Sequence, residues 1–331
     1  MNTSTASSLE TTESASTHPS SISELGDASN LNVQRRRLLQ VGLSAVATIP
    51  LVAQAQTGAA TPPSTSAVAS EETVTFERRG NVALIGINRP AAQNRIDPAT
   101  FAALGRAYYQ YEQDPTLRAA VLFGHGDNFS MGLDAQAFGP SIASGKFTLD
   151  VPGTINPMGT SKAWLTKPLI VVVQGNAWFV GHELCLAADI RIAASNAKFS
   201  QGEVNYALFP GGGGTIRFVQ EAGWGQAMRY ILTGEVWDAA EAKRLGLFQE
   251  VATTPEAAMK LALDMASKIA AEAPLAIKAA LASAHAAASS ADQQQAYAAL
   301  LPQFGALMRT QDFQERMHSI GEKRAPVYQG K

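Results

Sequence analysis

Cysteine, charge of one sign and long apolar runs are all scarce in this sequence. Its 331 residues include one cysteine, Cys185, which excludes an internal disulfide and any multi-cysteine metal site. No second ligand stands at metal-binding spacing from His125, so we predict no metal. The formal net charge of −2 gives no reason to expect a nucleic-acid partner. With 46% apolar and 16% charged residues, the chain can build one large core or two small ones.

Residues 1–72 differ in composition from the rest of the chain. Residues 1–30 are rich in Ser and Thr and have few large apolar side chains, so we expect them to be disordered. Residues 57–72 carry no helix or strand pattern, and we interpret them as a linker.

Residues 31–56, between these two segments, resemble a twin-arginine export signal. Arg35 and Arg36 precede two leucines, a moderately apolar stretch over residues 41–52 and an Ala-Gln-Ala cleavage site at residues 53–55. The stretch is shorter than the roughly 20 apolar residues that span a bilayer, so no stable membrane span is expected. The pattern predicts a periplasmic protein. The alternatives are a cytoplasmic protein whose signal is not used, or a chance basic cluster in a disordered tail.

From residue 73 onward the sequence has the pattern of a folded α/β domain. Residues 74–87 predict a hairpin that turns near Gly80. Asp97 followed by proline predicts a helix over residues 98–113, and a further strand is expected over residues 119–124. Strands and helices continue to alternate, which indicates stacked β-β-α units with largely buried strands.

Helix-forming residues dominate after Thr215. Glycines divide the pattern into short pieces, and the break points are Gly223, Gly225, Gly234 and Gly246. Residues 257–288 are rich in Ala, Lys, Met and Leu, which are strong helix formers. We expect much of their flat apolar face to meet another subunit. The chain is therefore divided into a core over residues 73–252 and a C-terminal helical oligomerisation region over residues 253–331.

The stretch over residues 175–215 places Glu183 and Glu203 beside two glycine-bearing turns. A β-branched run leads into the first turn, an apolar helix carries Glu183, and a second strand leads to Glu203. The four glycines of residues 211–214 are not a P-loop, because no Gly-Lys-Ser/Thr follows them. Backbone amides beside two carboxylates suit chemistry at an activated carbonyl.

This order of elements resembles the enoyl-CoA hydratase/isomerase family, also called the crotonases. The resemblance covers residues 73–330 and implies a crotonase-like α/β spiral of repeated β-β-α units, assembled as a homotrimer or a dimer of trimers. It also implies an acyl-CoA or related thioester as substrate, with coenzyme A as part of the substrate and no separate cofactor.

The resemblance places an oxyanion hole between two backbone N–H groups. Residues 128–134 are similar to the family segment in which the residue after the glycine donates, and here that residue is Leu133. The second donor lies three residues before the first glutamate, which makes it Val180. An N–H group in the first turn of a helix has no partner within the helix and carries partial positive charge, so it can stabilise an enolate-like oxygen.

Glu183 and Glu203 match the two glutamates of the hydratase branch. By resemblance, Glu183 activates water and Glu203 donates a proton to the α-carbon. Two close carboxyl groups in an apolar cleft split their pKa values, which keeps one protonated. The isomerase branch usually relies on the second glutamate alone, so the pair favours hydration. The alternative is that Glu183 caps a helix and Glu203 is a solvated loop acid.

The sequence departs from the family beside the second donor. Phe179 and Val180 occupy positions that are usually glycine, and His182 replaces a small residue. We expect the oxyanion hole to be retained with a different acyl shape, and Phe179, His182 and Asp134 to contact the substrate.

A second departure concerns the site for the CoA nucleotide. The lysine common after the family's first strand is absent, which leaves Arg89 and Arg95 as candidates to contact phosphate.

Three functions are consistent with these residues. The leading hypothesis is an enoyl-CoA hydratase-like lyase that adds water across the double bond of an unsaturated acyl thioester. The second is another crotonase reaction, either double-bond isomerisation or hydrolysis of a thioester or a carbon–carbon bond. The third is a noncatalytic binding protein in which Phe179 and Val180 fill the hole. Acyl-CoA is a cytoplasmic metabolite, so either export does not occur or the ligand is not a CoA ester.

Overall fold

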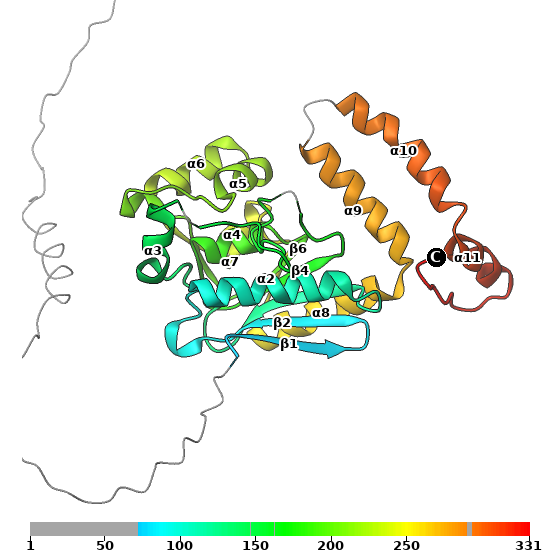
Figure 1. The fold of residues 1–331 in the computed structure, drawn as a ribbon, viewed down its shortest axis with the longest axis horizontal. Coiled ribbons are helices and arrows are strands. Elements are labelled where there is room, and N and C mark those ends of the chain that lie inside the picture. Colours follow the sequence, from blue (N-terminus) through cyan, green and yellow to red (C-terminus); the bar gives the residue numbers. More distant parts are fainter. Residues whose placement is uncertain (1–71, 146, 162, 290–292) are drawn as a thin grey trace, which may run out of the picture. The chain divides into compact units, whose positions relative to one another are not determined.

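A six-stranded sheet with the order β1-β2-β3-β4-β6-β9 forms the centre of the computed structural model (Figure 1). The structure describes residues 72–145, 147–161, 163–289 and 293–331. The expected disordered segment, export signal and linker over residues 1–71 lie outside these residues. The strands of the sheet are β1 (Val74–Arg79), β2 (Val82–Ile87), β3 (Ala119–Gly124), β4 (Leu169–Val173), β6 (Ile190–Ala194) and β9 (Glu250–Ala252).

The strand directions confirm the expected α/β fold. Strands β1 and β2 form the expected antiparallel hairpin around Gly80, and the pairs from β2 to β9 are parallel. Helix α2 (Pro98–Gln113) begins where expected, because the Asp97 side chain accepts a hydrogen bond from the Thr100 amide and proline follows Asp97.

Both faces of the sheet are buried, which explains why the strands are almost continuously apolar. Val82 and Leu84 belong to one core cluster, and the alternate residues Ala83 and Ile85 belong to the other. Helix α8 (Pro255–Ala271) covers the first face with four alanines at a spacing of four residues, namely Ala258, Ala262, Ala266 and Ala270. The alanine-rich face of α8 therefore packs on the sheet of its own chain and not on another subunit, which corrects the expectation for this part of residues 257–288.

A smaller sheet and short helices lie beside the carboxyl ends of the parallel strands. The sheet has the order β5-β7-β8, with β5 (Asn176–Trp178), β7 (Lys198–Ser200) and β8 (Val236–Asp238). The surrounding helices are η1 (Pro90–Ala92), α3 (Ala135–Ala143), α4 (Val180–Leu186), η2 (Glu203–Tyr206), α5 (Gly214–Ala222), α6 (Trp224–Thr233) and α7 (Ala239–Arg244). Gly223 and Gly234 end helices as expected, whereas Gly225 lies inside α6.

The chain ends in three helices, α9 (Pro274–Ser289), α10 (Gln293–Leu307) and α11 (Gln311–Gly321). Helices α9 and α10 pack against each other and extend beyond the sheet (Figure 1). No residue of α9 whose side chain is described is buried. None of the described helices is long and apolar enough to cross a membrane.

Candidate active site

The segment after β3 presents the amide of Leu133 to the segment after β4. Ile96 donates to the Gly132 carbonyl (2.9 Å) and accepts from the Asp134 amide (2.8 Å). In this parallel pairing the N–H group of Leu133, between them, points away from Ile96. No hydrogen bond joins this N–H group to another described residue. The Leu133 amide is therefore available to an external acceptor.

Gly132 allows this segment to approach the start of helix α4 closely. Its φ is +83°, and a Cβ atom added there would lie 2.9 Å from the Trp178 carbonyl oxygen and 3.0 Å from the Phe179 Cβ atom. The structure thus brings the backbone that carries the Leu133 amide against the residues that precede Val180.

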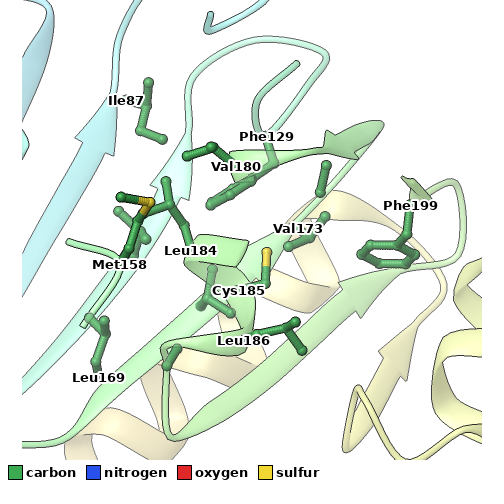
Figure 2. Close-up of a cluster of buried hydrophobic side chains, with 14 of the residues drawn as sticks. Ile87, Phe129, Met158, Leu169, Val173, Val180, Leu184, Cys185, Leu186 and Phe199 are labelled. Atoms are coloured by element: carbon green, nitrogen blue, oxygen red, sulfur yellow. The ribbon is translucent and has the colours of Figure 1, made fainter. Parts of the chain in front are cut away.

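Val180 is the first residue of α4, so its N–H group has no partner within the helix. The Val180 side chain belongs to the main buried cluster, where Figure 2 shows it among Phe129, Leu184 and Met158. The core thus accommodates the branched side chain that replaces glycine.

Phe179 has φ +54° and ψ −125°, a conformation that favours glycine. A residue other than glycine pays about 1–3 kcal/mol for such a backbone and keeps it only where neighbours impose it. Here its amide donates to the Ser200 carbonyl (2.9 Å), and its carbonyl accepts from the Gln201 Nε2 atom (2.9 Å) and from the Glu183 amide (3.0 Å). The ring packs edge-on against Tyr206, with centroids 5.7 Å apart.

Glu183 is buried with one carboxylate oxygen held and the other unpaired. Its Oε1 atom accepts hydrogen bonds from the amides of Gly212 (2.7 Å) and Gly214 (2.9 Å). Its Oε2 atom has no hydrogen-bond partner among the described residues. Burial raises the pKa of Glu183, while the two amides and the positive charge of Arg217 oppose the rise. The carboxylate is oriented by fixed donors and offers one oxygen.

Glu203 begins the short helix η2, close enough to Glu183 for their charges to interact. Burial is the main reason that the pKa of Glu203 rises to about 7, and the charge of Glu183 adds to the rise against the opposing effect of a backbone hydrogen bond. Its buried Oε2 atom also lacks a partner among the described residues. The structure therefore brings the two glutamates into one site, where burial raises the pKa of both and brings that of Glu203 close to neutral pH.

His182 lies in the core, and its expected contact with the substrate stays a prediction. It is fully buried, and its ring meets Phe199, Phe218 and Trp237 at centroid distances of 5.7, 5.7 and 5.1 Å. Burial lowers the pKa of His182 to about 3, so the ring is neutral. Sequence position alone could not show that this face of α4 turns towards an aromatic cluster.

The other expected contact residues make structural interactions. Arg89 pairs with Asp97 (3.1 Å), the residue that caps α2. Arg95 donates to the Met131 carbonyl (3.4 Å), which places it beside the turn that carries Leu133. Asp134 caps α3 by accepting from the Ala137 amide (3.2 Å). Contacts of Arg89, Arg95 and Asp134 with substrate stay predictions.

Two residues of the site, Met158 and Arg217, were not found from the sequence. The Met158 sulfur and the Glu183 Oε2 atom both approach Gly212 so closely that a Cβ atom added there would overlap them. Arg217 binds the carbonyls of Met158 and Gly159 (2.8 Å each). Neither residue has a local sequence pattern that distinguishes it. Within the described ranges, no three His, Cys, Asp or Glu side chains converge on a possible metal position.

Comparisons with known proteins show the family and the fold of the chain. The family described as "Enoyl-CoA hydratase/isomerase" matches residues 77–331. An (E)-benzylidenesuccinyl-CoA hydratase from Thauera aromatica is 36% identical over 78% of this chain and 99% of its own length. An enoyl-CoA hydratase from Mycobacterium tuberculosis is 33% identical over 77% of this chain and 96% of its own length. The crystal structure of a probable enoyl-CoA hydratase/isomerase from Mycobacterium abscessus superposes with a TM-score of 0.76 at 40% identity, over 78% of this chain and 99% of that one.

Proposed function

This chain belongs to the enoyl-CoA hydratase/isomerase family and acts as a hydro-lyase on an enoyl-CoA, and we propose that Glu183 and Glu203 carry out the addition of water. The observation that carries this assignment of roles is the contrast between the two carboxyl groups. Burial raises the pKa of both groups, but two amides and Arg217 oppose the rise at Glu183, whereas the pKa of Glu203 is raised to about 7. One group suits a base, and the other suits an acid.

In the proposed reaction, the Oε2 atom of Glu183 accepts a proton from water while the water oxygen bonds to the β-carbon. The electrons of the double bond move into the thioester, whose oxygen becomes an enolate. Glu203 then gives its proton to the α-carbon. Transfer of one proton from Glu183 to Glu203, directly or through solvent, restores the starting state.

The amides of Leu133 and Val180 are proposed to bind the enolate oxygen. Neither N–H group has a hydrogen-bond acceptor among the described residues, and Gly132 closely approaches Phe179. Both observations support this role. Preorganised N–H donors need no rearrangement as the charge develops, and one such donor contributes roughly 3 kcal/mol to the transition state. The Val180 side chain packs in the core. This packing favours an open oxyanion hole and argues against the noncatalytic alternative, in which Val180 fills the hole.

A cavity of about 140 Å³ beside helix α2 is proposed to receive the acyl tail. Its lining includes Phe101, Phe147 and Ile155, and also Pro157, the residue before Met158. Ile155→Phe would narrow it, and we expect the KM for a medium-chain enoyl-CoA to rise more than that for crotonyl-CoA.

We propose a homotrimer or a dimer of trimers formed through the C-terminal helices. Apolar side chains on α10 and α11 support this assembly, since Leu301 is 81%, Phe304 62% and Ile320 56% exposed within one chain. Sedimentation of the protein and of a Leu301→Glu variant tests it, and a monomeric wild-type protein would contradict it.

We also propose export through the signal over residues 31–56, on the sequence pattern alone. Cell fractionation of the protein and of a variant with Arg35 and Arg36 changed to lysine tests this. Equal periplasmic amounts, or a wholly cytosolic wild-type protein, would contradict it. A periplasmic location would also point to a thioester carrier other than cytoplasmic CoA.

The test of function is the hydration of crotonyl-CoA by the purified protein, followed by loss of enoyl absorbance. We expect turnover by the wild type and a fall of roughly 10²–10⁴-fold in Glu203→Gln, the range for loss of a general acid. Equal rates would remove the role of Glu203. Ligand binding without turnover would favour the noncatalytic alternative.

A further inference from the structure

Arg217, on helix α5, holds a loop that comes from a distant part of the chain. Its Nη1 atom donates to the Met158 carbonyl and its Nη2 atom to the Gly159 carbonyl, both at 2.8 Å. A planar guanidinium binds two neighbouring acceptors at once, which the single ammonium of lysine does not reproduce.

The same guanidinium also lies against the turn that holds Glu183. A Cβ atom added at Gly213 would lie 2.7 Å from the Arg217 Nη1 atom, and one at Gly159 would lie 3.1 Å from the Nη2 atom. Both glycines have positive φ, +106° and +60°. Close approach is thus possible on both sides, and Arg217 fits between the two backbone segments.

Both segments lie close to the Glu183 carboxylate. Gly212 and Gly214, on either side of Gly213, donate to its Oε1 atom. The Met158 sulfur and the Glu183 Oε2 atom both lie where a Cβ atom of residue 212 would stand. Met158 therefore places an apolar thioether next to the oxygen that lacks a described partner.

We infer that Arg217 is a positioning residue: it locks the Met158 segment against the Gly212–Gly214 turn and thereby fixes the Glu183 carboxylate between amide donors and an apolar cover. For catalysis this inference rests on the proposed hydration. Arg217 acts through the backbone and through Glu183, without contact to the reacting atoms.

The charge of Arg217 predicts the direction in which the pKa of Glu183 changes when Arg217 is replaced. Arg217 opposes the rise that burial causes in the pKa of Glu183. The other charged groups around this pair are Glu203, which interacts with Glu183, and Glu221 and Arg191, which interact with Arg217. Without the Arg217 charge, the pKa of Glu183 rises further. As the pH falls, Glu183 is therefore protonated, and stops acting as a base, at a higher pH.

The experiment compares the pH dependence of kcat/KM for crotonyl-CoA in two variants of Arg217. In Arg217→Gln we expect kcat to fall roughly 10²-fold, as for a displaced catalytic group, and the acid limb to move to higher pH. In Arg217→Lys the acid limb stays near its wild-type position, because lysine keeps the charge. The value of kcat still falls, because lysine does not keep both hydrogen bonds to the Met158 and Gly159 carbonyls. Arg229→Gln, which removes an exposed arginine paired with Glu235, is the matched control and should change neither.

Met158→Ala gives a prediction of opposite sign. Loss of the thioether admits water to Glu183, so its acid limb should move to lower pH. A uniform loss of rate without any movement of the limb in Arg217→Gln and Met158→Ala would overturn the inference. If circular dichroism shows that Arg217→Gln does not fold, the Arg217→Lys and Met158→Ala profiles decide the question by the same criteria.

Infrared titration of the Glu183 carboxyl group, assigned with Glu183→Gln in the absence of substrate, separates this inference from the proposed function. If the wild-type protein shows no turnover, hydration is refuted. If the pKa of Glu183 is nevertheless higher in Arg217→Gln than in the wild type, the positioning role is retained. A Glu183 titration that does not move would refute the positioning role, whether or not the enzyme hydrates its substrate.

Discussion

The pH dependence of hydration should show a loss of activity above about pH 7 that belongs to Glu203. The pKa of Glu203 is raised from the ordinary 4.5 to about 7, chiefly by burial. An ordinary glutamic acid would be protonated in only about 0.3% of molecules at pH 7, whereas a pKa of about 7 leaves about half protonated. The environment of Glu203 therefore increases the population of the acid form more than roughly 100-fold at neutral pH.

The assay is the steady-state hydration of crotonyl-CoA between pH 5 and 9. We expect kcat/KM to fall roughly tenfold per pH unit above about 7, as the proton of Glu203 is lost. The slower Glu203→Gln variant should lack this alkaline limb, because glutamine does not titrate. Glu235→Gln, which changes an exposed glutamate, is the control and should retain the limb. A rate that increases through pH 8, or an unchanged limb in Glu203→Gln, would refute the assignment of Glu203 as the acid.

Two substitutions test the surroundings of the site. Gly132→Ala adds a Cβ atom 2.9 Å from the Trp178 carbonyl at a φ of +83°, so the turn must shift with the Leu133 amide; we expect kcat/KM to fall roughly 10²–10³-fold, and an unchanged value would contradict the donor role. His182→Leu removes two buried ring nitrogens without described partners and should raise the free energy of unfolding by about 1–2 kcal/mol at pH 7, measured by urea denaturation. The folded pKa of His182 is lowered from 6.5 to about 3, so wild-type stability is lost as the pH falls below 6.5; the leucine variant should lose less, and equal losses would contradict the neutral buried ring.

The sequence predicted those parts of the structure that local signals determine. Gly80 ends a strand and allows the hairpin, and Asp97 caps the helix over residues 98–113, so both elements appear where expected. The glutamate pair was found because its spacing and flanking turns resemble those of the family, and the structure brings Glu183 and Glu203 together.

The remaining parts depend on contacts between residues far apart in the chain. Arg217 and Met158 are 59 residues apart, and no sequence pattern near either residue predicts the contact. The aromatic surroundings of His182 could not be predicted, because the residues that form them come from β7, α5 and β8. The alanine face of α8 was assigned to another subunit because composition shows that a face is flat, but not which surface it meets.

The most direct test of the two-carboxylate mechanism is mass spectrometry of the product formed from crotonyl-CoA in deuterated water that also carries heavy oxygen. The mechanism predicts that the wild-type protein forms a product with one solvent oxygen on the β-carbon and one deuterium on the α-carbon. It also predicts no product above background with the Glu183→Gln/Glu203→Gln double variant. Equal product from the two proteins, or a wild-type protein that leaves the enoyl-CoA unchanged, would contradict it.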